Sequence, residues 1–250
     1  MSSCSQSVPA LALDGVGFAY GPRKVLNDVS FSVGAGTFCV LLGINGAGKT
    51  TLFSLITRLF LCRQGHIRIL GRDLGQDGSG ALARMGVVFQ QPTLDLDLTL
   101  RQNLRYFCTL QGLDPSIARP RIVRALAQIG LTDRAGDKVR QLSGGQRRRL
   151  ELVRAMLHEP DLLLADEPTV GLDIHSRQNI LQQVRGDCRE RGVGVLWATH
   201  LVDEVESGDQ VAVLHQGRVM MQGGIETLLA ETGADTVKDA FNRLTQGKPE

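Results

Sequence analysis

The feature that most constrains the fold is a glycine-rich loop that follows a short apolar run. Residues 38–42 are continuously apolar, which predicts a buried strand of a parallel sheet. A helix is predicted over residues 49–60, because its leucine and isoleucine side chains recur on one face. A strand, a glycine loop and a helix in this order form a phosphate-binding loop. The loop itself reads Gly43-Ile44-Asn45-Gly46-Ala47-Gly48-Lys49-Thr50.

This loop has the chemistry of a nucleoside triphosphate site. Glycines let main-chain N–H groups turn inward around an anion, and the helix start adds a positive dipole end. Lys49 is expected to reach the β- and γ-phosphates, and the Thr50 hydroxyl to ligate Mg²⁺. A chance glycine turn is disfavoured by the full pattern, although the loop alone suits a kinase, a GTPase or an ATPase. The predicted nucleotide-binding residues here are Gly43, Asn45, Gly46, Ala47, Gly48, Lys49, Thr50 and Thr51.

A pair of carboxylates, Asp166 and Glu167, ends another apolar run. In a parallel sheet the carboxyl ends of the strands meet at one edge, so the pair is expected beside the phosphate loop. Asp166 suits Mg²⁺ binding, and Glu167 suits polarisation of an attacking water. Solvated acids at a strand end are the alternative, which the order of the motifs disfavours.

The run Leu142-Ser143-Gly144-Gly145-Gln146 precedes a basic helix that contains Arg147, Arg148, Arg149 and Arg154. A serine hydroxyl and glycine amides at a helix start form a second anion site. Since the Lys49 loop is expected to hold one nucleotide, a second phosphate-binding surface in the same chain implies a nucleotide shared between two subunits. A serine N-cap followed by a flexible glycine turn is the alternative interpretation.

The rest of the chain predicts an α/β fold with a mostly parallel sheet and antiparallel strands near the N-terminus. A helical subdomain, about residues 91–159, is inserted between strands at 86–89 and 162–165. The predicted elements are strands at 11–13, 29–33, 66–70 and 193–198, helices at 144–158 and 174–190, a hairpin of 211–214 with 219–221, and a helical stripe at Val237, Ala240, Phe241 and Leu244.

With these motifs in order, residues 8–230 resemble the nucleotide-binding domain of an ABC transporter, a P-loop ATPase, followed by a short C-terminal helix and tail over 231–250. The resemblance implies that Tyr20 stacks on adenine, with edge-strand packing as the alternative. Gln90 matches the Q-loop glutamine of the Mg²⁺ and water site. Gln91 is adjacent, so the match is ambiguous by one residue, and the preceding apolar run favours Gln90. Asp173 matches the D-loop carboxylate, and His200 the switch histidine that reads the γ-phosphate.

The family also implies partners and cofactors. Two copies would form a head-to-tail dimer, in which Ser143, Gly144, Gly145 and Gln146 of one subunit close over ATP and Mg²⁺ held by the other. Glu167, His200 and Gln90 would be catalytic. Closure and opening of the dimer would drive an integral-membrane permease docked on the helical subdomain.

The subgroup is indicated by residues 90–99 and 143–150, which resemble ATPases that serve ABC-2-type exporters. An importer ATPase remains an alternative, as does a soluble ABC ATPase that acts on ribosomes, DNA or a regulatory partner. A metabolic kinase would not explain Leu142 to Gln146 or the segments around Asp173 and His200.

The composition sets limits on these interpretations. Of the 250 residues, 42% are hydrophobic and 22% are charged, with a net charge of +2, so nucleic acid is not an expected partner. No apolar run is long enough to cross a bilayer, and residues 1–10 do not resemble a signal peptide. We therefore expect a cytoplasmic protein held at the membrane by its permease. Cys4, Cys39, Cys62, Cys108 and Cys188 lack metal-site spacing and are expected to be reduced.

Overall fold

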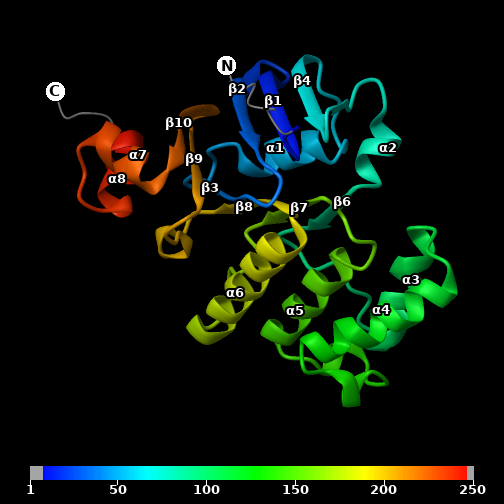
Figure 1. Ribbon diagram of the computed structural model, residues 1–250. Helices are drawn as coiled ribbons and strands as arrows, with labels where there is room; N and C mark the ends of the chain where they lie inside the picture. Colours follow the sequence, from blue (N-terminus) through cyan, green and yellow to red (C-terminus); the bar gives the residue numbers. More distant parts are fainter. Residues whose placement is uncertain (1–7, 247–250) are drawn as a thin grey trace, which may run out of the picture.

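The computed structural model describes residues 8–246 and contains two β-sheets (Figure 1). The first is antiparallel, as predicted for the N-terminal strands, and has the strand order β2-β1-β4-β5. Its strands are β1 (Leu11–Tyr20), β2 (Arg23–Val33), β4 (Gln64–Ile69) and β5 (Arg72–Asp73).

The second sheet has six strands in the order β10-β9-β3-β8-β7-β6, and every pair except β10–β9 is parallel. Its central strands are buried on both faces, which explains their continuous apolar sequences. Its strands are β3 (Phe38–Leu42), β6 (Met85–Val88), β7 (Leu162–Asp166), β8 (Gly194–Thr199), β9 (Gln210–His215) and β10 (Arg218–Gly224). The mostly parallel α/β fold and the closing hairpin are confirmed.

The two faces of this sheet bury separate apolar cores. Cys39 and Leu41 of β3 point to the core shared with the antiparallel sheet and α1 (Lys49–Ile56). Val40 and Leu42 point to the opposite core, which includes residues of four helices. These are α5 (Gly144–Ala155), α6 (Ile174–Arg191), α7 (Ile225–Thr232) and α8 (Val237–Gln246).

A helical block lies between β6 and β7, as predicted, and projects from the sheet edge (Figure 1). It has an apolar core of its own, in which Leu104 and Leu126 are buried. Its helices are α3 (Leu100–Leu110), α4 (Pro115–Gln128) and α5 (Gly144–Ala155), with the short 3₁₀ turns η1 (Thr132–Arg134) and η2 (Val139–Gln141); a third turn, η3 (Val202–Glu204), follows β8.

Several predicted boundaries were wrong. The helix expected over residues 49–60 ends at Ile56, because Thr57 caps it and Arg58 turns into the left-handed region at φ 58°. The helix expected over 144–158 ends at Ala155. The strand β5, helix α7 and helix α2 (Gly78–Leu82) were not predicted; α2 has two glycines in five residues, a composition that disfavours helix.

Two further features of the described residues bear on the sequence predictions. No helix within residues 8–246 is both long and apolar enough to span a membrane. Cys39, Cys62, Cys108 and Cys188 are free thiols, and Cys4 lies outside the described residues.

Candidate nucleotide-binding and catalytic site

The glycine loop connects the carboxyl end of β3 to the first turn of α1. Gly46 and Gly48 have φ angles of 83° and 111°, which side chains other than glycine rarely adopt. Gly48 is also the N-cap of α1, and a Cβ atom there would lie 2.8 Å from Leu26. The loop therefore needs glycine at these positions, and it presents the free N–H groups of a helix start.

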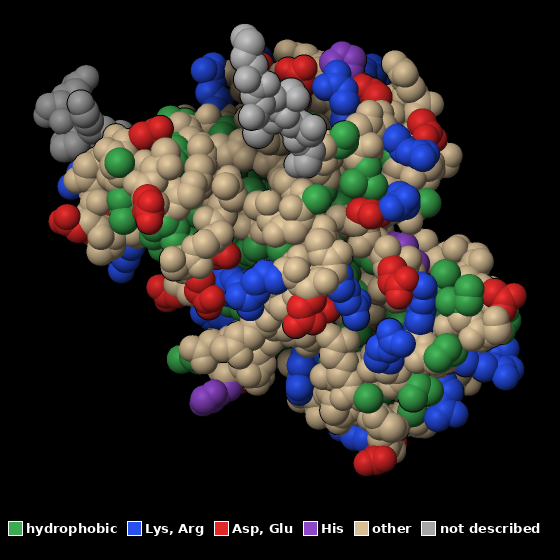
Figure 2. Space-filling model, in the orientation of Figure 1, with side chains coloured by type: hydrophobic (Ala, Val, Ile, Leu, Met, Phe, Trp, Pro, Cys, Tyr) green, Lys and Arg blue, Asp and Glu red, His purple; other side chains and the backbone are tan. Residues whose placement is uncertain are grey.

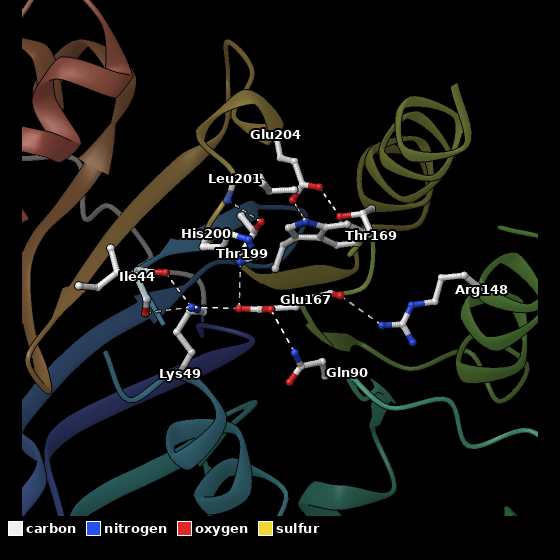
Figure 3. A network of polar contacts seen from close by, with 12 residues as sticks. Ile44, Lys49, Gln90, Arg148, Glu167, Thr169, Thr199, His200, Leu201 and Glu204 are labelled. Atoms are coloured by element: carbon white, nitrogen blue, oxygen red, sulfur yellow. Dashed lines mark hydrogen bonds and ion pairs between the residues drawn. The ribbon is translucent and has the colours of Figure 1, made fainter. Parts of the chain in front are cut away.

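Lys49 is the first residue of α1, and its side chain folds back along the loop (Figure 3). Its Nζ atom donates to the carbonyl oxygens of Gly43 at 2.7 Å and Ile44 at 3.3 Å. The same atom lies 3.1 Å from Glu167 Oε1, and both side chains are buried. The lysine is thus held inside the loop with its charge facing the end of β7.

Three side chains from separate segments converge on the Glu167 carboxylate (Figure 3). Besides Lys49, the His200 Nδ1 atom lies 3.3 Å from Oε1, and Gln90 Nε2 donates to Oε2 at 3.2 Å. The main chain of Glu167 has a positive φ of 45°, and its N–H donates to the Ala198 carbonyl oxygen at 2.9 Å. Strained backbone of this kind concentrates at functional sites, where the surroundings hold it in place.

A cleft of about 800 Å³ opens beside this cluster. Gln90 lines it, whereas the adjacent Gln91 does not, so the structure distinguishes the two glutamines. Sequence reasoning missed Arg23, Val25 and Val170, which also line the cleft. The predicted residues that line it are Tyr20, Asn45, Gly46, Gly48, Lys49, Thr50, Thr51, Gln90, Glu167 and His200. Gly43 and Ala47 belong to the loop but do not line the cleft, and Ala47 is buried.

Tyr20 stands at the end of β1, half exposed, where it both packs against neighbouring rings and lines the cleft. Its ring lines the cleft, and it also packs edge-to-face against Phe18 and Phe60 at centroid distances of 5.0 and 5.7 Å. Such packing fixes the orientation of a ring. An aromatic face is therefore available at the cleft's outer edge.

Asp166 is the last residue of β7 and is almost completely buried. Burial raises the pKa of its carboxyl group, and a hydrogen bond from Thr50 opposes that shift. Among the described residues, its Oδ1 atom has no hydrogen-bond partner. A buried carboxylate oxygen without a donor, beside a hydroxyl group, suits a hard cation such as Mg²⁺, which favours one or two carboxylates together with phosphate oxygens. The residues present therefore fit Mg²⁺.

The segment Leu142 to Gln146 lies at the start of α5, with Ser143 as N-cap. The Gln146 N–H donates to Ser143 Oγ at 3.3 Å, and the Ser143 N–H donates to Gln146 Oε1 at 3.0 Å. The serine N-cap of the alternative interpretation is thus correct, whereas Gly144 and Gly145 form the first turn of α5 and not a separate glycine turn. This arrangement leaves the N–H groups of Gly144 and Gly145 at a helix N-terminus, where anions bind.

Asp173 caps the neighbouring helix α6. Its carboxylate accepts hydrogen bonds from the Ser176 N–H and hydroxyl group at 2.9 and 2.7 Å, which lower the pKa of Asp173. A Cβ atom on Gly145 would come within 2.8 Å of Ser176 Oγ, so the two helix starts touch. Among the described residues that line the cleft, neither Asp173 nor any residue of 142–146 is found.

The fold and the loop define a P-loop nucleoside triphosphatase. Residues 26–170 match the sequence profile of the ABC transporter family, which is more than half of the chain. The chain belongs to this family and is an ATP-binding subunit with ATPase function.

Its curated relatives include ATP-binding proteins named for resistance and export. The linearmycin resistance ATP-binding protein LnrL of Bacillus subtilis is 36% identical over 91% of this chain and 73% of its own length. The daunorubicin resistance ATP-binding protein DrrA3 of Streptomyces coeruleorubidus is 37% identical over 91% and 72%. The Nod factor export ATP-binding protein I of Paraburkholderia xenovorans is 36% identical over 92% and 76%.

Solved structures show the same fold. One described as the ATP binding subunit of an ABC transporter superposes with a TM-score of 0.85 at 28% identity, covering 94% of this chain and 99% of the other. Another, cbiO1 of Clostridium perfringens, superposes with a TM-score of 0.80 at 27% identity, covering 89% and 91%.

Proposed function

We propose that this chain is the energy-coupling subunit of an exporter, in which ATP hydrolysis by a homodimer drives a membrane permease. The observation that carries the proposal is the convergence of Lys49, Gln90 and His200 on the Glu167 carboxylate, each within 3.3 Å. The cluster places Lys49, which can bind phosphate, next to the Glu167 carboxylate, which can accept a proton. Both lie at the edge of a cleft large enough for a nucleotide.

The residues have separate roles in this proposal. The loop amides and Lys49 bind the phosphates, while Thr50, Asp166 and Gln90 hold Mg²⁺, which neutralises phosphate charge. Glu167 orients and deprotonates the attacking water. His200, within reach of the same carboxylate, contacts the γ-phosphate.

The remaining nucleotide-binding residues fall into two groups in this proposal. Tyr20 stacks on adenine at the outer edge of the cleft. Ser143, Gly144, Gly145, Gln146 and Asp173 act on the ATP of a second copy of the chain. Two observations support this arrangement: among the described residues these five do not line their own cleft, and the α5 N-terminus offers free N–H groups.

The permease partner and the direction of transport are inferred from relatives. Proteins named for drug resistance and Nod factor export support an exporter. In this proposal the subunit is cytoplasmic, lies against the membrane through its permease, and binds no nucleic acid. The ATP-binding domain spans residues 8–230, with the permease docked on the inserted block 91–159. The short C-terminal helix and tail follow over 231–250, of which residues 247–250 lie outside the described residues.

The test is capture of the partner from its native cell. A tagged chain purified from detergent extract is expected to retain a multi-span membrane protein encoded beside it, with ATPase activity in the complex. Retention of ribosomal or DNA-bound partners instead would favour the non-transport alternative, and a permease that carries its substrate inward would favour import.

A further inference from the structure

Arg148 differs from the other basic side chains of the helical block. Figure 2 shows many Lys and Arg side chains spread over the surface of that block. Arg148 lies on α5 but is only 7% exposed. A buried guanidinium is costly unless its charge is paired and its N–H groups are satisfied, so Arg148 requires specific partners.

The Arg148 guanidinium touches two loops at the carboxyl edge of the sheet. From its Nη1 atom it donates to the carbonyl oxygen of Phe89 at 2.7 Å, immediately before Gln90. Its Nε atom donates to the Pro168 carbonyl oxygen, and Nη2 donates to the Glu167 carbonyl oxygen at 3.4 Å. One side chain thus holds the main chain on both sides of the Gln90–Glu167 contact.

Glu151, one helical turn further along α5, completes the arrangement. It is 2% exposed, and its Oε2 atom accepts from Arg148 Nη1 at 2.7 Å. Its other oxygen, Oε1, accepts from the Thr93 N–H at 2.6 Å. The ion pair therefore fastens α5 to the loop after β6 at two points, on either side of Gln90.

We propose that Arg148, fixed by Glu151, is a positioning residue that sets the distance between Gln90 and the Glu167 carboxylate. The inference rests on the proposed roles of those two residues in ATP hydrolysis. The planar fork of arginine can reach three carbonyl oxygens and one carboxylate together, which a lysine ammonium cannot do. Because Glu167 has a positive φ, two contacts to the carbonyls of residues 167 and 168 hold its strained backbone in place.

The arrangement also ties the catalytic carboxylate to the helical block. Arg148 stands on the same helix that Ser143 begins, so a displacement of α5 is transmitted to Phe89 and Glu167 through one guanidinium. The proposed permease-docking block and the proposed base, Glu167, are therefore linked mechanically. A displacement of about 1 Å at a reacting group can reduce the rate of a reaction by two orders of magnitude.

The test separates positioning from folding with paired variants of the full chain. Arg148→Lys keeps the charge but loses the fork. Arg148→Met with Glu151→Met removes the whole buried pair, a change that often preserves stability because no unpaired charge remains. Arg121→Lys is the matched control, since Arg121 also joins a carbonyl oxygen (Leu157) and a carboxylate (Glu159) within the block, but touches neither catalytic loop.

For each variant we would measure the melting temperature, the Kd for ATP, and kcat and KM for ATP hydrolysis. Arg148→Lys and the double variant are expected to lose kcat at least tenfold, with Kd and KM within about twofold of the wild type. Arg121→Lys should keep wild-type kcat.

Wild-type kcat in Arg148→Lys, or a loss of kcat that merely follows a loss of melting temperature or ATP affinity, would overturn the inference. Glu167→Gln is measured alongside. If that variant turns over normally, the proposed function itself is wrong; if it is inactive while Arg148→Lys is normal, only the positioning role is wrong.

Discussion

Glu167 and Lys49 form a buried ion pair, with Oε1 and Nζ 3.1 Å apart, between the end of β7 and the start of α1. The lysine is the proposed ligand of the γ-phosphate, and the carboxylate is the proposed base. A γ-phosphate at Lys49 would therefore compete with Glu167 for the ammonium group. This competition determines how substitutions at either residue affect binding and hydrolysis.

Glu167→Gln should retain ATP binding and lose steady-state hydrolysis by about 100-fold or more, the scale of general-base catalysis. Because the amide is neutral, it competes less for Lys49, so the Kd for ATP should be unchanged or lower. Equilibrium binding and phosphate release would be compared with Glu190→Gln, an exposed acid on α6. Near-normal turnover would remove Glu167 as the base.

Ser143→Arg should prevent ATP-dependent dimerisation while leaving monomeric ATP binding intact, because a bulky cation would fill the proposed phosphate surface at α5. The substitution also removes the N-cap bond to Gln146, which costs about 1 kcal/mol of stability. Ser143→Ala loses the same cap without the bulk and is the control. Light scattering with ATP would measure the molar mass; dimerisation of Ser143→Arg would argue against the shared site.

Tyr20→Ala should weaken ATP binding about tenfold, the lower range of base stacking on an aromatic ring, while binding of inorganic tripolyphosphate stays unchanged. Tyr20→Phe should behave as wild type, and Tyr106→Ala, which removes an exposed tyrosine of α3, provides the control. Equal losses for ATP and tripolyphosphate would mean that Tyr20 supports the loop and does not contact the base.

Cys39 predicts a pH dependence of stability. Burial raises the pKa of this thiol from 9.0 to about 12. The unfolded chain releases the thiol proton above pH 9, while the folded chain keeps it. The contribution of Cys39 to the free energy of unfolding is therefore intact below pH 9 and falls between pH 9 and 12. Cys39→Ala should reduce the slope of unfolding free energy against pH by about 1.4 kcal/mol per unit in that window, as measured by denaturant titrations. An unchanged slope would contradict the assignment.

The sequence predicted those parts of the site that depend on strand ends. Apolar runs before Gly43, Asp166 and His200 identified buried parallel strands, and parallel strands deliver their following residues to one edge. The antiparallel sheet and the helical block were predicted from two other signals, the alternation of apolar residues in the strands and their helical periodicity in the block.

Other features depend on tertiary contacts and leave no periodic signal. Arg148 is one of four arginines in a basic helix, and nothing in that run distinguishes the buried one from the other three, which are half-buried. Its ion pair with Glu151 follows an i, i+3 spacing that is common on helix surfaces.

The early end of α1 arises from the left-handed conformation of Arg58, a residue type that gives no turn signal.

Mixing two inactive variants tests most directly whether two chains share the ATP site. Lys49→Ala disables the phosphate loop, and Ser143→Arg disables the surface offered to the partner. A head-to-tail dimer of one chain of each kind has one intact site, built from the loop of the Ser143→Arg chain and the α5 N-terminus of the Lys49→Ala chain. Each variant alone should be inactive, and the mixture should hydrolyse ATP. A mixture as inactive as its components would contradict the shared site.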